Sequence, residues 1–365
     1  MPLYESTRGL ESLKTSIERI AAAYGFTSPQ VGLSQKSVAS QPTNDHQTAT
    51  QLSLIQAKAK DGYATPTAVW GGAKKGHSTT LAFSILSARH VIAHALVVKA
   101  AMSVAELIGY TDITLTLSSI GDQESRRRFT RELTNFFRKN MNEVPDDLRA
   151  LAARDPLAAY HELVKRDNIL EKLPRPIDSL SESSRKTMLD TLALFESVGI
   201  EYVISPHLMG TPLVQSELLF AITGTNKKGE KEVIARGGRV DDYARKFMKT
   251  GLGVSIAITV PANIEYRDHP QVLSCFVVHV GEAAKHKAFA LMEALWRAEL
   301  AVGQALLSDN LREQMQLAQK NGATYVGIIG QREAIDGTVL VRHLTSLVQE
   351  SISQTKLPTY LAKKV

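Results

Sequence analysis

Residues Cys275–Gly281 read Cys-Phe-Val-Val-His-Val-Gly, and they open the stretch of sequence that decides the fold. A helical pattern follows as far as Ala298, and a second one begins near Leu311. The turn Ile328–Glu333 reads Ile-Ile-Gly-Gln-Arg-Glu and precedes the strand-like run Asp336–Arg342. This alternation of short apolar strands with helices predicts a small α/β unit whose helices cross between strands.

The bulk composition is that of a globular protein. A chain of 365 residues is long enough for two domains, and its 44% hydrophobic and 22% charged residues argue against wholesale disorder. The formal net charge of +6 permits contact with a polyanion such as RNA but does not establish it.

Three features of the sequence indicate the cellular compartment of the protein. Cys275 is the only cysteine and has no partner for an internal disulfide, which suits a reducing compartment. The first residues, Met1–Glu5, do not form a basic region followed by an apolar run, so we expect no signal peptide. No apolar run reaches the roughly 18 residues that a membrane span needs. We therefore expect a cytoplasmic protein without membrane contact.

The chain upstream of the α/β unit alternates helices and strands around one polar segment. Residues 28–60 are rich in Gln, Ser, Thr and Asn and contain Pro29 and Pro42, so they are predicted to form a long polar loop. Hydrophobic periodicity assigns the rest. We expect helices at Gly9–Tyr24, Ala88–Ile108 and Asp122–Asn140 and through much of 145–200, and strands at Thr79–Leu86, Asp112–Ser118, Leu218–Thr223, Lys231–Ala235 and Gly253–Val260. Residues 261–270 are the expected linker, which divides the chain into domains 1–262 and 271–365.

The C-terminal stretch resembles the anticodon-binding domain of histidyl-tRNA synthetases. Leu311, Gln314, Ala318, Gly322-Ala323, Gly330, Glu333 and Gly337 follow that family's order. Upstream, Ser119–Asp122, Arg154–Leu157, Ala235–Arg239 and Leu252–Ile256 are similar to segments of the same family's catalytic core. The resemblance implies a class II synthetase-like core, with a mixed, mainly antiparallel sheet and helices, followed by a small α/β anticodon-binding-like domain.

The residues that carry the family's chemistry are changed. The family holds the α-phosphate of ATP with an arginine in a Phe-Arg-x-Glu segment, because charge builds there in the transition state. The corresponding stretch here, Ala68–His77, contains neither Arg nor Glu. The arginine that ends the family's motif 3 is replaced by Val260. We therefore expect no catalytic residues and no cofactor.

The expected amino-acid pocket is changed as well. The family recognises histidine with an Arg-Gly-Leu-Asp-Tyr-Tyr segment, and Gly210–Gln215 stands in its place. These side chains do not make a pocket that hydrogen-bonds imidazole without other partners. Arg239 is the one candidate for a residual nucleotide cavity, and its alternative role is a surface ion pair with Asp241 and Asp242.

Basic residues supply the RNA-binding candidates. Arg126, Arg127 and Arg131 lie on one predicted helix, and Lys356, Lys363 and Lys364 lie near the C-terminal end. Such residues can contact phosphates. For the three arginines, a solvent-exposed helix whose arginines form ion pairs with Glu124 and Glu132 is an equally good explanation. Lys74–His77 is either a phosphate-binding loop or, with more support, an exposed hairpin tip.

Metal binding and nucleophilic catalysis receive little support. His90 and His94 stand four residues apart, but no third ligand is suggested, so we expect core histidines and no metal. Cys275 has no adjacent acidic or histidine partner and is expected in the core. The P-loop, His-Glu-x-x-His and Gly-x-Ser-x-Gly motifs are absent from the sequence.

These expectations lead to one main hypothesis and two alternatives. The main hypothesis is a non-catalytic paralogue of histidyl-tRNA synthetase that binds tRNA-like RNA or a protein partner. The resemblance and the Ala/Val-rich helix at 88–108 suggest a homodimer. One alternative is a regulatory subunit of ATP phosphoribosyltransferase, which generally lacks such a C-terminal domain. The other is an active histidine–tRNA ligase, which the missing arginines oppose.

Overall fold

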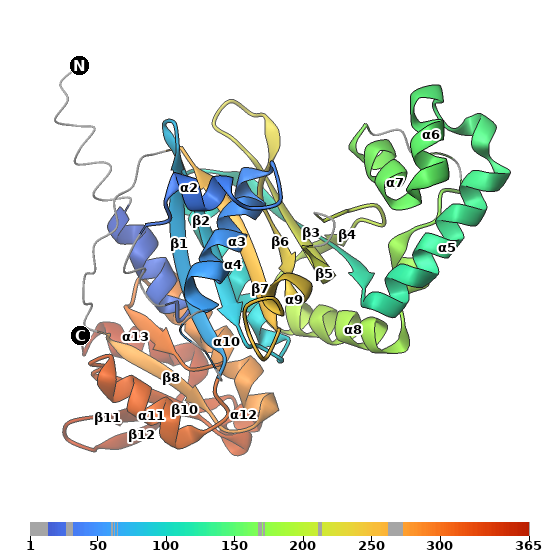
Figure 1. The fold of residues 1–365 in the computed structure, drawn as a ribbon. Helices are drawn as coiled ribbons and strands as arrows, with labels where there is room; N and C mark the ends of the chain where they lie inside the picture. Colours follow the sequence, from blue (N-terminus) through green and yellow to red (C-terminus); the bar gives the residue numbers. More distant parts are fainter. Residues whose placement is uncertain are drawn as a thin grey trace.

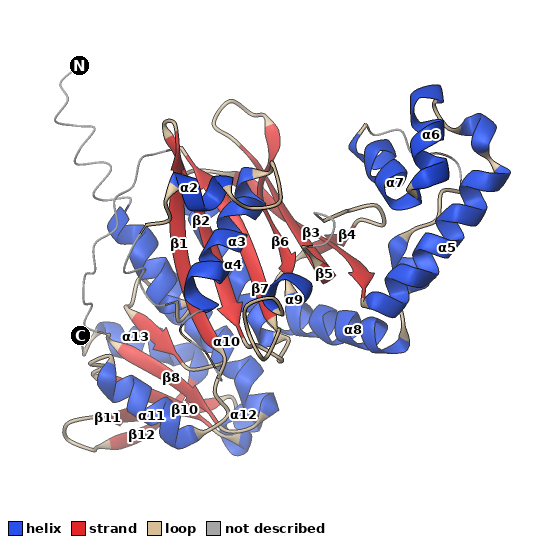
Figure 2. Cartoon of the chain, in the orientation of Figure 1, coloured by secondary structure: helices blue, strands red, loops and turns tan. Residues whose placement is uncertain are grey.

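The computed structural model describes residues 14–26, 32–59, 61, 63, 65–166, 170, 172–210, 214–261 and 273–364. Two sheets organise the chain, one in the core and one in the C-terminal domain (Figures 1 and 2). Besides a helix over 14–23, the helices are α2 (Gln35–Ala39), α3 (His46–Ala59), α4 (Ile92–Leu107), α5 (Gln123–Lys139), η1 (Met141–Glu143), α6 (Asp146–Arg154), α7 (Pro156–Lys165), η2 (Pro176–Ser179), α8 (Glu182–Ser197), α9 (Asp241–Ala244), α10 (Glu282–Arg297), α11 (Leu311–Lys320), α12 (Gln331–Asp336), η3 (Gln354–Lys356) and α13 (Leu357–Ala362).

The core sheet has seven strands and is mainly antiparallel. Its strands are β1 (Thr67–Lys75), β2 (Ser78–Leu86), β3 (Thr111–Gly121), β4 (Tyr202–Ile204), β5 (Ser216–Thr225), β6 (Lys231–Arg239) and β7 (Gly253–Val260), in the order β1-β2-β7-β6-β5-β3-β4. Only the β3–β4 pair is parallel. Lys75 pairs with Ser78, so Lys74–His77 form the exposed tip of the β1–β2 hairpin. The mixed, mainly antiparallel sheet expected from the resemblance is confirmed.

Helices cover both faces of this sheet, because alternate strand residues point to opposite sides. Phe83 and Ile256 face α4, while Ala82 and Ala257 face α3. The helix over 14–23 packs on the outer side of α4 through Ile17, Ile20 and other apolar residues. Most apolar residues of α4 are thus buried within this one chain, although Leu107 near its end is exposed, so this helix does not present the large apolar face from which a dimer was inferred.

The prediction of a polar loop over 28–60 is wrong for the described residues 32–59. Two helices occupy them: the Ser34 side chain accepts the amide of Ser37 to begin α2, and Asp45 accepts the amide of Thr48 at the start of α3. The buried face of α3 carries polar residues whose side chains bond to the sheet. Gln51 Nε2 donates to the Arg236 carbonyl at 2.8 Å, and Gln47 Nε2 donates to the Ile234 carbonyl at 2.9 Å. These bonded polar residues hid the helical period of the apolar ones.

A helical arm, made of α5, η1, α6, α7 and η2, extends from the β3–β4 side of the sheet (Figure 1). It has its own apolar cluster, which includes Phe129, Leu133, Phe137 and Tyr160. The Asp122 side chain accepts the Ser125 amide at 2.8 Å and so caps α5, at the start of the helix expected over Asp122–Asn140. Ser181 Oγ also donates to Asp122, which ties the two ends of the arm together.

The C-terminal sheet contains β8 (Cys275–His279), β9 (Val302–Gln304), β10 (Tyr325–Ile329), β11 (Thr338–His343) and β12 (Gln349–Ser353), in the order β12-β11-β10-β8-β9. Strands β9, β8 and β10 are parallel and are joined by crossing helices, as predicted. Cys275 lies in the core of this domain, where burial raises its thiol pKa to about 12.

The C-terminal domain docks on the core through α10. Glu293 accepts the Tyr24 hydroxyl at 2.5 Å and pairs with the Lys99 ammonium at 2.7 Å, and all three side chains are buried. Apolar residues of α10 belong to the same hydrophobic cluster as those of α4 and the helix over 14–23.

Two expectations fall wholly or partly outside the described residues, apart from the residues given next. Of the expected linker 261–270 only Pro261 is described, and of the expected helix Gly9–Tyr24 residues 14–23 are seen as helix, ending at Gly25 with φ +80°. None of the described helices is long and apolar enough to cross a membrane.

Candidate functional site

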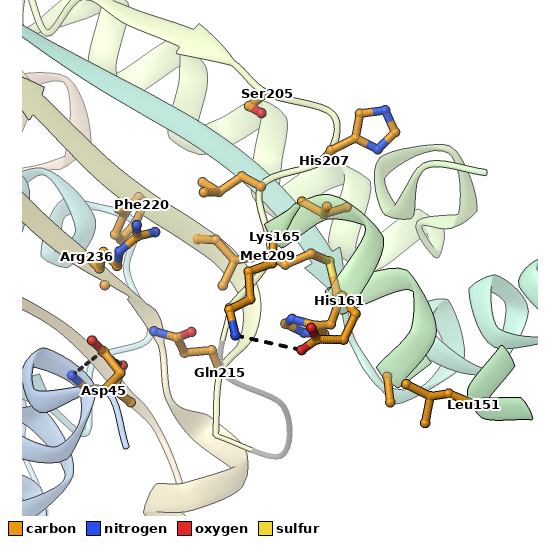
Figure 3. A pocket seen from close by; sticks show the side chains of 18 residues that line it. Asp45, Leu151, His161, Lys165, Ser205, His207, Met209, Gln215, Phe220 and Arg236 are labelled. Atoms are coloured by element: carbon orange, nitrogen blue, oxygen red, sulfur yellow. Dashed lines mark hydrogen bonds and ion pairs between the residues drawn. The ribbon is translucent and has the colours of Figure 1, made fainter. Parts of the chain in front are cut away.

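A groove of about 1020 Å³ lies between the core sheet and the helical arm (Figure 3). Three separate parts of the chain form its walls: the start of α3, the helices α6 and α7, and the segment 205–220 together with β6. The lining residues are Asp45, Thr48, Leu151, Ala158, His161, Glu162, Val164, Lys165, Ser205, His207, Leu208, Met209, Gly210, Gln215, Leu219, Phe220, Arg236 and Gly237. The resemblance assigns the segment Gly210–Gln215 to the amino-acid pocket, and Gly210 and Gln215 of this segment line the groove.

The two sides of the groove differ in character. Arg236, Gln215 and Asp45 lie on the sheet side, while Lys165 and Glu162 of α7 form a weak ion pair at 3.8 Å on the arm side (Figure 3). Apolar residues, such as Leu151, Leu208 and Leu219, line the groove as well. The groove can therefore hold a ligand with both polar and apolar parts.

Two histidines in the groove are held neutral by their surroundings. Burial lowers the pKa of His161, and burial together with the Arg175 charge lowers the pKa of His207. The Tyr160 hydroxyl lies 2.8 Å from His207 Nδ1, and burial raises the pKa of this tyrosine. Neutral imidazoles cannot supply the positive charge that the family places around a phosphate.

A second cavity of about 580 Å³ adjoins the groove and shares Asp45 and Arg236 with it. Lys75 and Ser78 of the β1–β2 hairpin and Thr259 of β7 also line it, so it lies where the two arginine-bearing motifs of the family would meet. Val260 is fully buried at the end of β7, opposite Thr79. Arg236 is the single arginine among the described residues that line either cavity.

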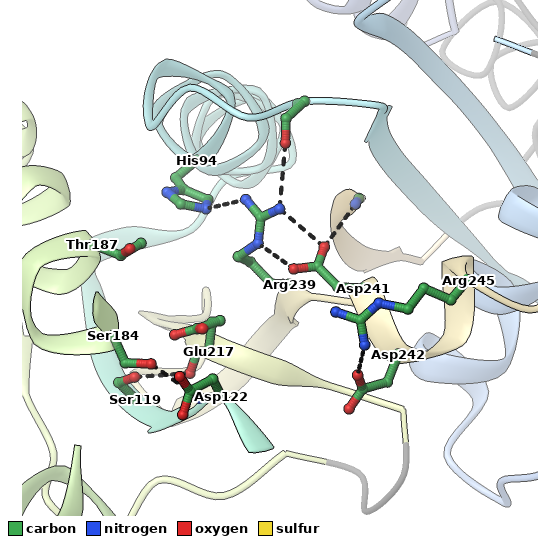
Figure 4. A network of polar contacts seen from close by, with 12 residues as sticks. His94, Ser119, Asp122, Ser184, Thr187, Glu217, Arg239, Asp241, Asp242 and Arg245 are labelled. Atoms are coloured by element: carbon green, nitrogen blue, oxygen red, sulfur yellow. Dashed lines mark hydrogen bonds and ion pairs between the residues drawn. The ribbon is translucent and has the colours of Figure 1, made fainter. Parts of the chain in front are cut away.

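Arg239 lies away from the groove and is buried (Figure 4). Its guanidinium makes two bonds of 2.9 Å to Asp241 and contacts the Ala88 carbonyl and His94 Nε2 at 3.3 Å. The ion pair with Asp241 is therefore internal rather than at the surface, and Asp242 pairs with Arg126 and Arg245 instead. These contacts tie Arg239 to neighbouring structural elements, and it is not among the residues that line the groove.

The two candidate histidines of the helix near 88–108 have different environments. His94 is fully buried, and burial and the Arg239 charge lower its pKa well below the usual value. His90 precedes α4 and is half exposed, with Nε2 3.4 Å from Asp309 of the C-terminal domain. The expectation of a core histidine therefore describes His94 but not His90.

The basic candidates fall into two groups at different ends of the molecule. Arg127 and Arg131 are exposed on one face of α5, while Arg126 is paired with Asp242 at 2.5 Å. Glu124 pairs with Arg128, and Glu132 accepts the Ser179 hydroxyl. Lys356, Lys363 and Lys364 are exposed on the C-terminal domain, which lies across the core from the arm (Figure 1).

Several groove residues escaped the sequence reasoning. Asp45 and Thr48 were placed in a loop, and His161, Lys165, His207 and Arg236 carried no recognised motif. Of these residues, Arg236 could have been predicted from the sequence. It precedes Gly237 and Gly238 in the segment Ala235–Arg239, which resembles part of the family's catalytic core.

Comparison with known proteins agrees with this architecture. Residues 274–364 match the family model described as an anticodon binding domain. The histidine–tRNA ligase of Geobacillus kaustophilus is 27% identical over 275 residues, which cover 73% of this chain and 65% of that protein. The ligase of Lysinibacillus sphaericus is 26% identical over 278 residues, with 73% and 66% covered. The chain thus spans slightly less than two thirds of these relatives.

A solved structure shows the shared fold over the whole chain. The apo histidyl-tRNA synthetase of S. aureus superimposes with a TM-score of 0.56 at 18% identity, covering 98% of this chain and 97% of that one. Together, the matched C-terminal domain, the ligase relatives and the shared fold identify this chain as a histidyl-tRNA synthetase-like protein, with a class II synthetase fold and a C-terminal anticodon-binding domain.

Proposed function

We propose that this chain is a non-catalytic histidyl-tRNA synthetase-like protein that binds tRNA-like RNA. One observation carries the proposal: the anticodon-binding domain is retained, while Val260 and an arginine-free β1–β2 hairpin stand where the family places its two catalytic arginines. Binding of RNA needs the retained domain, whereas adenylate formation needs the two arginines that are missing here.

The missing charges predict that histidine is not activated. Loss of one preorganised contact to a developing negative charge costs about 3 kcal/mol of transition-state stabilisation, and two such contacts are lost here. We expect histidine-dependent ATP–pyrophosphate exchange at the level of a no-enzyme control, with an active histidine–tRNA ligase assayed in parallel. Exchange above that background would support the alternative of an active ligase.

The exposed basic groups predict RNA binding that depends steeply on salt. Arg127 and Arg131 lie far from Lys356, Lys363 and Lys364, so an RNA that engages both groups must be large and folded. A site with about four phosphate contacts should give a log–log salt slope near −3 to −4. Preference for tRNA over a single-stranded RNA of equal length separates recognition of shape from charge alone.

The full-length chain and charge-matched variants test this binding. Arg127→Ala/Arg131→Ala and Lys363→Ala/Lys364→Ala should each weaken tRNA binding and reduce the salt slope by about 2. Lys227→Ala/Lys228→Ala removes two exposed charges from the β5–β6 turn and should leave binding unchanged. If tRNA and unstructured RNA bind equally, or neither binds at low salt, the RNA proposal fails, and a protein partner is the hypothesis to test next.

We further propose a homodimer, which rests on the resemblance alone because most apolar residues of α4 are buried within one chain. Light scattering at micromolar concentration should give twice the chain mass. The mass of a single chain would contradict the proposal.

A further inference from the structure

A separate cleft of about 690 Å³ lies between the core and the C-terminal domain, and it shares no lining residue with the groove. On the core side it is formed by the start of β1 and the loop that joins β2 to α4. On the other side it is formed by the segment 304–310 and the first turns of α11. Neither the proposed loss of catalysis nor the proposed RNA surface uses this cleft.

The charges in the cleft divide by domain. The core side presents Arg89 and His90, whereas the C-terminal side presents Asp309 and Glu313. Arg89 is exposed, and within the described parts of the chain its guanidinium has no hydrogen-bond or ion-pair partner. Arg89 therefore makes the core side a positive wall that faces a negative wall of Asp309 and Glu313, and the two sides meet where His90 Nε2 lies 3.4 Å from Asp309 Oδ2. The cleft volume lies within the usual range of about 300–1,000 Å³ for small-molecule sites.

The negative wall is fixed before any ligand arrives. Asp309 Oδ1 accepts the Lys285 ammonium at 2.8 Å, and Lys285 is itself almost fully buried. Partial burial alone would raise the pKa of Asp309, but the Lys285 ammonium lowers it below the usual value, so this carboxylate stays ionised. Glu313 is oriented by the Ser308 hydroxyl at 2.8 Å.

We propose that this cleft binds a small zwitterion of the α-amino-acid class. The carboxylate of the ligand pairs with Arg89, and its ammonium group lies against Asp309 and Glu313. Apolar residues that also line the cleft, including Pro66, Ala305, Leu307 and Leu317, receive the side chain of the ligand. A ligand with only negative charge would face the two carboxylates, and one with only positive charge would face Arg89, so each leaves one wall unsatisfied.

The full-length protein tests this site directly. Each standard L-amino acid is titrated by calorimetry, together with the amine that lacks its carboxylate and the acid that lacks its amino group. We expect at least one amino acid to bind and both of its truncated analogues to bind about tenfold or more weakly, since each loses a charge-assisted contact. Arg89→Met and Glu313→Gln should each weaken binding to a similar extent, with unchanged melting temperatures because both side chains are exposed.

A variant of the groove distinguishes the two sites. Arg236→Met removes the arginine of the groove and should leave this binding unchanged. Binding that survives Arg89→Met but is lost in Arg236→Met would place the amino acid in the groove and overturn the proposal. So would the absence of binding by every amino acid, or equal binding of an amino acid and its amine. Loss of RNA binding would leave this site untouched, so the two proposals fail separately.

Discussion

Glu217 has an environment that is poorly suited to its charge. It lies at a bulge of β5, where the pairing with both β3 and β6 shifts, and its φ of +54° is unusual for a residue with a side chain. Burial raises the pKa of its carboxyl, and the nearby Asp122 adds to this effect, although Ser184 and Arg239 partly oppose it (Figure 4). One of its carboxylate oxygens, Oε2, is buried without a hydrogen-bond partner.

This raised pKa predicts that Glu217 lowers stability as the pH rises. The folded state holds the proton more tightly than the unfolded state, so stability falls once the pH exceeds the ordinary glutamate pKa of about 4.3. We expect Glu217→Gln to melt at a higher temperature than the wild type at pH 7, with the difference shrinking towards pH 4. The exposed Glu201→Gln should show no such trend. A Glu217→Gln advantage that is equal at both pH values would contradict the electrostatic explanation.

At the scale of elements, the sequence predicted what local periodicity encodes. Strands β2, β3, β5, β6 and β7 were found because their apolar runs are bounded by clear turns, and α5 lies where a helix was expected. Helix α3 was missed because the buried Gln51 and the half-buried Gln47 bond to the backbone of β6, which one sequence does not reveal. The groove could not be predicted for a related reason: its walls come from segments as far apart as Asp45 and Arg236.

The close approach of β6 and β7 behind the groove depends on Gly237. A Cβ at this position would lie 2.3 Å from the Ser255 carbonyl oxygen and 2.6 Å from Ile256 Cα, both of which are backbone atoms that cannot turn aside. We expect Gly237→Ala to separate the strands and lower the free energy of unfolding by about 1–3 kcal/mol, as overpacking does. Urea titration measures this change. Gly32→Ala, whose nearest neighbour is 3.9 Å away, serves as the control, and equal stability of the two variants would refute the role of Gly237.

At the scale of the whole molecule, the two domains behave as one packed body around α10. The sequence predicted a separate C-terminal domain from residue 271, and it gave no sign that one face of α10 would be buried by the core. Tyr24, Lys99 and Glu293 lie on three elements that are distant in sequence, and they meet in a buried polar contact at this interface. Burial and the charge of Glu293 raise the pKa of Tyr24 well above its usual value, so its hydroxyl remains a donor to that carboxylate.

This interface predicts that the chain unfolds in one step. Removal of one partner from a buried ion pair leaves an uncompensated charge and costs about 3–5 kcal/mol. Glu293→Ala leaves the Lys99 ammonium and the Tyr24 hydroxyl without their shared acceptor, so the C-terminal domain should lose its attachment before the core melts. We expect calorimetry to show a single transition for the wild type and two for this variant. Lys287→Ala, on the exposed face of the same helix, should keep the single transition. Two transitions in the wild type would mean that the contact of Glu293 with Lys99 and Tyr24 contributes little. Two transitions in Glu293→Ala alone would identify this contact as the main connection between the two domains.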